Sequence, residues 1–283
     1  NNVPAYKRFL SEVKDGVTPM TVWKYTDVGH SQDATKEVKD LFDGAAYFDY
    51  PKPAKLIKQL VSLCTNNDDI ILDFFSGSGT TAHAVTELNA EDGGNRRWIC
   101  VQLPELTDEK SEAYKAGYHT IADISRERIR RASTKIHTDF ADKLVEREKP
   151  LDLGFRSYSV GESNFKPWNE MVTNPEEIRQ QMLDIIDPIE PDATDESILT
   201  ELLLKRGISP MTEVKTYDDF VFVPSENLVI SLSHHMTEEL FAQILTESPS
   251  RIILLDRAFR NDINLKTNLI LQAEKQSIVV EVM

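Results

Sequence analysis

The sequence predicts an α/β protein in which a partial parallel sheet is followed by a smaller α/β domain. A short apolar run at residues 70–75 ends in a glycine-rich turn, and a helical pattern begins at Thr80. This succession is typical of a buried strand, a tight turn and a helix. A second apolar run at 96–103 predicts another strand, which a right-handed crossover would place parallel to the first. Short strands and helices alternate again after residue 197.

Composition allows two domains, because 283 residues with 40% hydrophobic content can bury sizeable cores. We predict a first domain at 1–135, a connector with an acidic, proline-bearing linker at 136–196, and a small α/β assembly domain at 197–283. No apolar stretch approaches the roughly 18 residues that a membrane-spanning helix needs. A cytoplasmic protein without membrane contact is therefore expected.

Charge is distributed unevenly along the chain. Residues 1–150 hold 21 Lys and Arg against 24 Asp and Glu, a balance of −3, so the remaining residues carry −12 of the net −15. The acidic C-terminal half is therefore not expected to be a DNA-binding surface. Cys64 and Cys100 lie in apolar patterns and are expected to be reduced core residues. No Cys/His cluster has metal-ligand spacing, and the isolated His234 and His235 are expected at the surface.

The first elements in chain order are a helix at 6–13, an extended segment at 18–25 and a helix ending near Phe42. Pro51 and Pro53 hold the following residues extended and lead into a helix. The apolar positions at helical spacing predict that one face of this helix is formed by Leu56, Ile57, Leu60, Val61 and Leu63.

The turn between the strand at 70–75 and the next helix is the centre of the predicted binding site. Gly77 and Gly79 can adopt positive φ and allow a ligand to approach the backbone. Amide groups at the start of the helix present partial positive charge to that ligand. Asp73, at the end of the strand, is placed to accept hydrogen bonds from a cationic amine or a loop N–H. A glycine turn that binds nothing is the alternative.

The residues of this turn, Asp73-Phe-Phe-Ser-Gly-Ser-Gly-Thr-Thr-Ala82, resemble motif I of the S-adenosylmethionine-dependent DNA amino-methyltransferases. Residues 48–57, Phe-Asp-Tyr-Pro-Lys-Pro-Ala-Lys-Leu-Ile, resemble motif X of the same family. Motif X before motif I is the order of the β-type enzymes, and the resemblance implies a partial Rossmann-like methyltransferase sheet. A P-loop is excluded because no lysine ends the turn, whereas a nicotinamide dinucleotide fingerprint is loosely satisfied by Gly77, Gly79 and Ala82.

After the second strand, Val-Gln-Leu-Pro-Glu at 101–105 resembles the modification subunits of type III restriction–modification systems. Either Gln102 or Glu105 is expected at the ribose hydroxyls, where Rossmann-like sites carry an acid. The helix at 121–132 resembles the same subunits and is amphipathic, with its basic side chains predicted on the polar side. That side is either a solvated face or a phosphate contact, and it comprises Arg126, Arg128, Arg130 and Arg131.

The remaining residues predict a charged helical connector at 133–150 and a strand at 152–160, followed by the acidic linker at 184–196. Helices are then expected at 198–205, 237–247 and 265–275, and strands at 219–223, 227–232, 251–255 and 277–282. Nothing in this region pairs a nucleophile with a base, so it is assigned to structure and assembly.

The resemblance implies an adenine-N6 DNA methyltransferase that uses S-adenosylmethionine and acts as the modification subunit beside a restriction (helicase/nuclease) subunit. The implied cofactor-binding residues are Lys52, Pro53, Asp73, Phe74, Ser76, Gly77, Gly79, Thr80, Gln102 and Glu105. No catalytic or metal-binding residue is assigned, because the family's Asp/Asn/Ser-Pro-Pro-Tyr/Phe loop is absent from this chain.

We therefore expect the chain to be the C-terminal portion of such a subunit, to be inactive by itself, and to meet DNA only within the full-length protein. The motif I strand would then have an unpaired edge, which favours aggregation or self-association. A homodimer is expected through the C-terminal domain. Two alternatives are a non-catalytic assembly module and a nicotinamide-dependent oxidoreductase.

Overall fold

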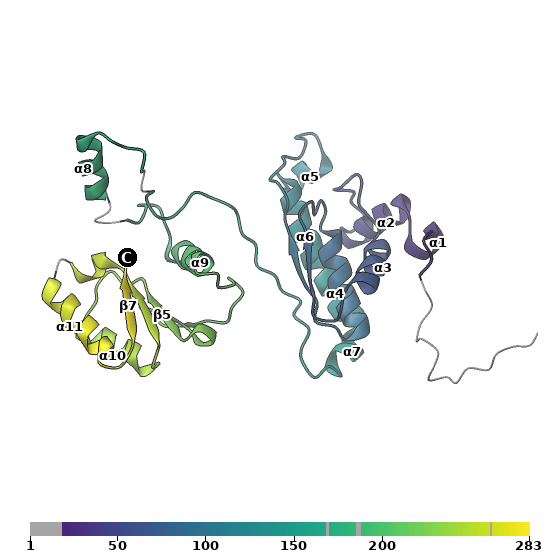
Figure 1. Ribbon diagram of the computed structural model, residues 1–283. Helices are drawn as coiled ribbons and strands as arrows, with labels where there is room; N and C mark the ends of the chain where they lie inside the picture. Colours follow the sequence, from purple (N-terminus) through teal and green to yellow (C-terminus); the bar gives the residue numbers. More distant parts are fainter. Residues whose placement is uncertain (1–18, 168–169, 185–187, 261) are drawn as a thin grey trace, which may run out of the picture. The chain divides into compact units, whose positions relative to one another are not determined.

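The computed structural model describes residues 19–167, 170–184, 188–260 and 262–283, and the chain divides into two compact units between Ser157 and Tyr158 (Figure 1). This boundary lies inside the segment predicted to be a connector. Both units combine helices and sheet, which confirms the α/β class. The helix predicted at 6–13 lies outside the described residues. None of the helices in the described ranges is long and apolar enough to cross a membrane.

The first unit contains a two-stranded parallel sheet with helices packed on one of its faces. Strand β1 pairs with β2 from Ile70 beside Arg97 to Asp73 beside Cys100. The described elements of this unit are α1 (Tyr25–Val28), α2 (Ser31–Leu41), α3 (Ala54–Cys64), β1 (Ile70–Asp73), α4 (Thr80–Asp92), β2 (Arg97–Cys100), α5 (Glu112–Lys115), α6 (Ile121–Asp139) and α7 (Ala141–Val145).

Helix α4 is the centre of this unit. Ten of its thirteen residues are buried, and it packs against α3, α6 and β2 (Figure 1). A helix that is covered on all sides needs small or apolar side chains, or polar ones that have partners. Ala82, Ala84 and Val85 are small or apolar, and His83 pairs with Glu37. The packing fixes the position of the N-terminus of α4, where the glycine turn joins it.

One face of the small sheet is uncovered by the described residues. Side chains alternate along both strands, so Ile71 and Trp98 pack against the helical side while Ile70, Leu72 and Ile99 point away. The last three are 52%, 57% and 51% exposed. Among the described strands β1 pairs with β2 alone, so one edge of β1 is also unpaired.

Helix α3 lies where the sequence predicts a helix, but its apolar face is less buried than expected. Val61 is buried, whereas Leu60 and Leu63 are 48% and 42% exposed. Cys64 is exposed as well, so its predicted place in the core is wrong. Apolar residues at helical spacing identify the apolar face of a helix. Whether another element covers that face depends on the tertiary structure.

The second unit is built on a mixed five-stranded sheet with strand order β3-β4-β5-β6-β7. The first three strands are antiparallel, and β5, β6 and β7 run parallel. Its elements are α8 (Pro175–Asp184), α9 (Asp195–Lys205), β3 (Lys215–Thr216), β4 (Val221–Val223), η2 (Pro224–Glu226), β5 (Leu228–Ser231), α10 (Glu238–Thr246), β6 (Arg251–Leu254), η3 (Asp256–Phe259), α11 (Ile263–Glu274) and β7 (Val279–Val282).

Both faces of this sheet are covered. Val229 and Ile252 face the cluster that contains Phe241 of α10, while Ile230 and Ile253 face the cluster that contains Leu202 of α9. The three predicted helices and four predicted strands after residue 197 are therefore present, with bounds shifted by a few residues. The strand predicted at 152–160 is wrong, because these residues form no strand. The side chains of this segment alternate in character, but no partner strand among the described residues lies beside it to form a hydrogen-bonded ladder.

Candidate functional site

The turn after β1 contains two glycines with positive φ, +55° at Gly77 and +79° at Gly79. They serve different purposes. A Cβ on Gly79 would lie 2.8 Å from Ser125 Oγ and 3.2 Å from a side-chain carbon of Ile129, so this glycine allows the turn to pack on α6. A Cβ on Gly77 would lie 3.4 Å from the ring of Phe48 and 4.0 Å from the Phe75 carbonyl oxygen. The backbone at Gly77 is therefore less enclosed than that at Gly79.

Asp73 connects the end of β1 to the first turn of α4. Its Oδ1 accepts a hydrogen bond from the Phe75 N–H at 3.1 Å, and its Oδ2 accepts from Thr81 Oγ1 at 2.5 Å. These bonds use part of the acceptor capacity of the carboxylate, because each oxygen has two lone pairs. The sequence placed this acid at the turn, and the structure adds that it also holds the turn in shape.

Gln102 lies beside the glycine turn and binds it directly. Its Oε1 accepts from the Gly77 N–H at 2.7 Å, and its Nε2 donates to the Leu103 carbonyl at 3.3 Å. Both polar atoms of the carboxamide are thus used within the chain. The Glu105 side chain is exposed and makes no hydrogen bond or ion pair within the described part of the chain. The two candidates for ribose contact therefore differ in availability.

The extended segment of motif X lies against the same turn. The Phe48 ring approaches Gly77, and Thr80 Oγ1 donates to the Lys52 carbonyl at 3.4 Å. Pro53 is buried at the N-cap position of α3, whereas Lys52 is exposed. The fold therefore brings together two segments that the sequence separates by about twenty residues, as the expected binding site requires.

A buried ionic network supports the turn from the side of α6, where the sequence predicts a polar face. Arg128 was predicted on the polar side of its helix, but its side chain is 0% exposed. It donates to Ser78 and Thr80 and pairs with Glu37 of α2. The spacing along the helix indicates this burial, because Arg128 follows the buried Ile124 by four residues and precedes the buried Ala132 by four.

Glu37 and His83 complete this network. His83 Nδ1 lies 3.1 Å from Glu37 Oε1, and the Ala54 N–H donates to Glu37 Oε2 at 3.2 Å. Burial alone would raise the pKa of Glu37, but His83, Arg128 and the Ala54 N–H together hold that pKa below its usual value. Glu37 is therefore ionised at neutral pH and balances the buried guanidinium.

The turn has features that fit a small polar ligand such as S-adenosylmethionine. Ser76 Oγ is buried and has no hydrogen-bond partner in the described ranges. Helices α2, α6, α9, α10 and α11 each begin with a side-chain cap, whereas α4 begins at Gly79 without one. A polar ligand could satisfy such groups. Phe74 and Phe75, which follow Asp73, are 62% and 80% exposed and offer aromatic surface beside the turn.

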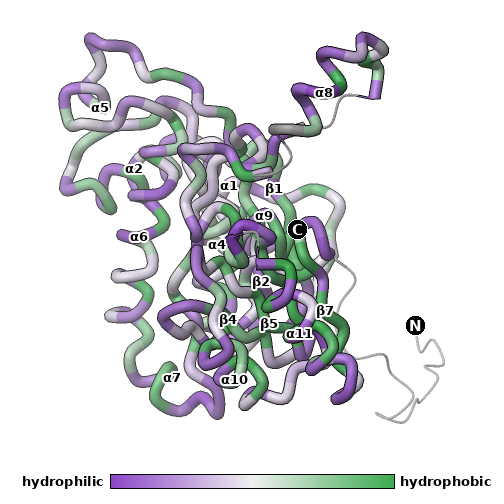
Figure 2. Tube along the Cα trace, turned by 90° about the vertical axis from the view of Figure 1, so that its left-hand side faces the viewer, coloured by the Kyte–Doolittle hydropathy of each residue, from purple (hydrophilic) through white to green (hydrophobic). Residues whose placement is uncertain are grey.

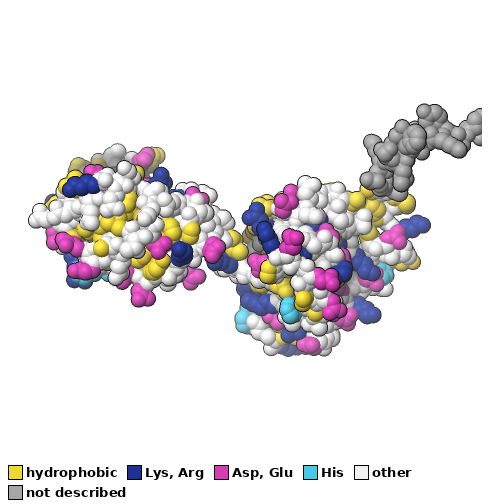
Figure 3. All heavy atoms as spheres, turned by 90° about the horizontal axis from the view of Figure 1, so that it is seen from below, with side chains coloured by type: hydrophobic (Ala, Val, Ile, Leu, Met, Phe, Trp, Pro, Cys, Tyr) yellow, Lys and Arg dark blue, Asp and Glu magenta, His cyan; other side chains and the backbone are white. Residues whose placement is uncertain are grey.

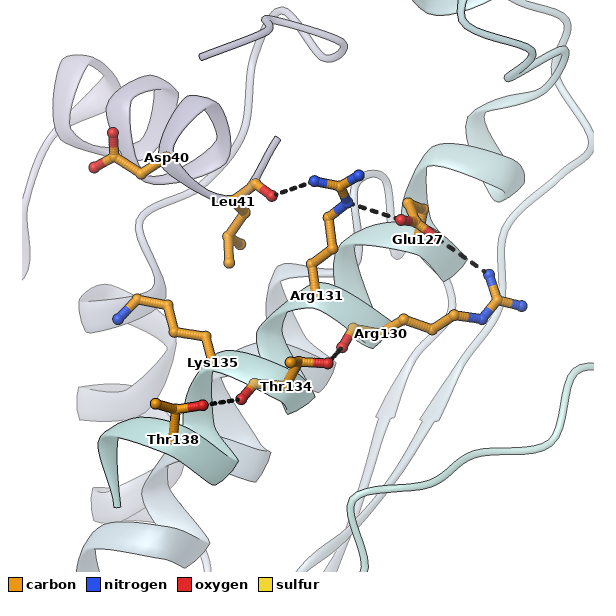
Figure 4. Close-up of a pocket in the computed structure, with 8 residues that line it drawn as sticks. All are labelled: Asp40, Leu41, Glu127, Arg130, Arg131, Thr134, Lys135 and Thr138. Carbon is orange, nitrogen blue, oxygen red and sulfur yellow. Dashed lines mark hydrogen bonds and ion pairs between the residues drawn. The ribbon is translucent and has the colours of Figure 1, made fainter. Parts of the chain in front are cut away.

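The exposed arginines of α6 do not form an unpaired basic surface. Arg131 binds Glu127 and the Leu41 carbonyl, and Arg130 pairs with Glu127 (Figure 4). Arg131 also pairs with Asp43, and Arg126 pairs with Asp123. Residues 130 and 131 line a surface pocket in which each guanidinium already faces a carboxylate. Acidic and basic side chains are also interspersed on the face of the first unit seen in Figure 3, the right-hand body. A solvated face fits these contacts better than a phosphate site.

The described residues contain no group of His, Cys, Asp and Glu that could hold a metal ion. His234 and His235 are exposed, as predicted. The site at the glycine turn therefore consists of a carboxylate, hydroxyls, backbone amides and aromatic rings.

Comparison with known proteins relates the segment around this site to DNA methylases. A family model described as DNA methylase matches residues 3–129. The StyLTI Mod subunit, a type III restriction–modification protein of Salmonella typhimurium, is 43% identical over 134 residues, which are 47% of this chain and 20% of that protein. The EcoP15I Mod subunit of Escherichia coli is 40% identical over 148 residues, 51% of this chain and 22% of that protein.

A relative outside type III systems is the Type II methyltransferase M.KpnI of Klebsiella pneumoniae, 35% identical over 146 residues, 52% of this chain and 34% of that protein. The chain thus spans about a fifth of the length of the modification subunits that it matches. The matched family segment includes motif X, the glycine turn and the strand that follows. Residues 3–129 thus match the DNA methylase family model, and the chain is similar to the modification subunits of type III restriction–modification enzymes.

Proposed function

We propose that the glycine turn binds S-adenosylmethionine and that the protein to which this chain belongs methylates DNA. The observation that carries the proposal is the juxtaposition of motif X with the turn, in which Ser76 has a buried hydroxyl without a partner. When bound, the cofactor supplies an electrophilic methyl group. Nucleophilic attack by a DNA base would require residues beyond those assigned here.

The residues of this chain would bind and orient the cofactor. Asp73 retains acceptor capacity for a cationic amine, and Ser76 can donate to a carboxylate. Lys52 and Pro53 would lie at the methionine end, with Gly77, Gly79 and Thr80 forming the turn and Phe74 beside it. Because Gln102 is bonded to the turn, Glu105 is the better candidate for the ribose diol.

The finer assignment is to adenine N6, as the modification subunit of a type III system that acts with a restriction subunit. The relatives of about 40% identity support the type III modification subunit, whereas adenine rests on the resemblance of the motifs alone. DNA binding and methyl transfer are proposed for the whole protein, and this chain by itself is expected to be inactive. A nicotinamide-dependent oxidoreductase is the less favoured reading, because the matched family is a DNA methylase.

Titration of the chain with S-adenosylmethionine by calorimetry tests the proposal, with NAD as the control ligand. Heat of binding with the methyl donor alone is expected. Binding of NAD, or of neither compound, would contradict the assignment of this turn as a methyl-donor site.

Variants at Asp73 test the role of the carboxylate. Asp73→Ala is expected to abolish detectable S-adenosylmethionine binding, because it removes both the ligand contact and the bonds to Phe75 and Thr81. Asp73→Asn keeps an acceptor for the turn but not the negative charge, so it separates the two effects. We expect Asp73→Asn to retain the wild-type unfolding midpoint and to bind at least about tenfold more weakly, as for loss of a charge-assisted hydrogen bond. Unchanged affinity in both variants would refute the pocket.

A further inference from the structure

One completely buried arginine joins the glycine turn to two helices. Arg128 lies in the middle of α6, whose hydrophilic and hydrophobic residues alternate along its length (Figure 2). Its Nη1 donates to Ser78 Oγ and to Thr80 Oγ1, each at 2.7 Å. Its Nη2 donates to Glu37 Oε1 of α2 at 2.9 Å. A planar guanidinium holds its donors in a fixed fork, so these partners are held at fixed relative positions.

Glu37 extends the connection to motif X. Its second oxygen, Oε2, accepts from the N–H of Ala54, the first residue of α3. The N-cap residue Pro53 has no side-chain oxygen that could accept this hydrogen bond. Glu37 therefore caps α3 from a distance of 17 residues along the chain. A continuous series of hydrogen bonds joins the glycine turn, α6, α2 and the start of α3.

The two hydroxyls bound by Arg128 flank the most constrained residue of the turn. Gly79 has a φ of +79°, and its neighbours Ser78 and Thr80 are only 2% and 5% exposed. Anchoring on both sides fixes the direction of the backbone through Gly79. The ligand-facing groups of the turn, Ser76 Oγ and the first amides of α4, take their positions from this backbone.

We propose that Arg128 is a positioning residue for cofactor binding, which together with Glu37 holds the glycine turn and the start of α3 in their relative arrangement. The inference rests on the proposed function, because the ligand concerned is S-adenosylmethionine. Arg128 has no exposed surface, so it acts through Ser78 and Thr80 and does not touch the ligand.

A purely structural role is the competing explanation, and a paired variant separates the two. Arg128→Met alone leaves Glu37 with one cation fewer and is expected to destabilise the whole unit. Arg128→Met combined with Glu37→Gln removes both charges, keeps similar volumes and retains an acceptor for the Ala54 N–H. We expect this double variant to fold like the wild type but to lack the anchors of the turn. Arg130→Met is the matched control on the same helix, since that side chain is 58% exposed and pairs with Glu127 at 3.6 Å.

Amide hydrogen exchange of the free chain is measured for residues 74–83, beside the thermal unfolding midpoint. In the double variant we expect exchange in this segment to be at least about tenfold faster, the factor associated with losing hydrogen bonds to a charged group. The unfolding midpoint should remain near the wild-type value, and Arg130→Met should change neither quantity. Wild-type exchange in the segment, or equally faster exchange throughout the first unit, would overturn the inference.

Calorimetric titration with S-adenosylmethionine supplies the second measurement. The double variant is expected to bind at least about tenfold more weakly than the wild type and the Arg130→Met control. Equal affinities would overturn the positioning role and leave the proposed function standing. If the wild type itself fails to bind while the exchange differs as expected, Arg128 does hold the turn and the proposed function is refuted.

Discussion

Gly77 and Gly79 show how residues of one type in one turn can have different roles. Both have positive φ, but only Gly79 is enclosed, by Ser125 and Ile129 of α6. The sequence predicts ligand approach at both glycines, and the enclosure of Gly79 leaves Gly77 as the more accessible candidate. A side chain at either position is strained, whereas only Gly79 would also force a buried helix to move.

Alanine at Gly79 is therefore expected to destabilise the first unit more than alanine at Gly77. An alanine at positive φ strains the backbone and lowers the free energy of unfolding of each variant by about 1–2 kcal/mol. At Gly79 alone, the clash of the new Cβ with Ser125 adds to this loss. Urea unfolding measures both. Gly79→Ala combined with Ser125→Gly should recover part of the difference, and equal losses for the two single variants would contradict the packing role.

The two cysteines are predicted to differ in reactivity. Cys64 is exposed, whereas Cys100 is half-buried and burial raises the pKa of its thiol to about 11. Since the thiolate is the reacting form, a thiol reagent at pH 7.5 should modify Cys64 at least about tenfold faster. Mass spectrometry of the labelled chain assigns the two sites, with Cys64→Ser as the control. Faster labelling of Cys100 would contradict the placement of β2.

At the scale of single elements, polar side chains of a helix hold neighbouring segments in place. In the second unit, Glu201 of α9 accepts from Ser163 Oγ, from both the N–H and the Nδ2 of Asn164, and pairs with Lys205. Burial alone would raise the pKa of Glu201, but these partners lower it to about 2. The helix thereby holds the segment that precedes α8.

The lowered pKa of Glu201 predicts a contribution to stability that is lost in acid. A carboxylate whose pKa is lowered on folding stabilises the native state above its unfolded pKa, near 4.5, and loses that contribution as pH falls towards about 2. We expect Glu201→Gln to lower the free energy of unfolding at pH 7 by about 2 kcal/mol and to differ little from wild type near pH 2.

Unfolding by urea at several pH values measures this difference directly. Glu213→Gln, at an exposed position in the same unit, is the control and should leave the pH dependence unchanged. A constant difference between wild type and Glu201→Gln across this pH range would contradict the assignment.

At the scale of the whole molecule, the sheet of the first unit exposes an apolar face, whereas both faces of the sheet in the second unit are covered. In the second unit, helices cover both faces of the sheet. In the first, Ile70, Leu72 and Ile99 are about half exposed on one sheet face, and β1 has no described partner on one edge. An apolar face with a free edge favours association.

We therefore expect the isolated chain to self-associate through this face. Leu72→Lys, at a side chain that is 57% exposed, should shift the mass measured by light scattering towards the monomer with little loss of stability. Ile263→Lys, at a 74% exposed apolar residue of the second unit, is the matched control. A monodisperse, monomeric wild-type chain would refute the expectation. If Ile263→Lys alone restores the monomer, association occurs through the C-terminal domain, as the predicted homodimer requires.

The sequence by itself determined the order of most elements and the place of the glycine turn. Periods of apolar residues and glycine positions are local signals, so they located β1, α4, β2 and the alternating elements after residue 197. The wording of motifs X and I likewise identified the family that the comparison found.

The tertiary structure alone decided which side chains are covered and by what. The sequence predicts Arg128 on a polar helix face together with other arginines. The side chain is buried instead, because Ser78, Thr80 and Glu37 in distant segments are its hydrogen-bond partners. Leu60 reads as a core residue but is exposed. Burial depends on the surface that neighbouring elements present, and long-range ion pairs join residues that no local pattern connects.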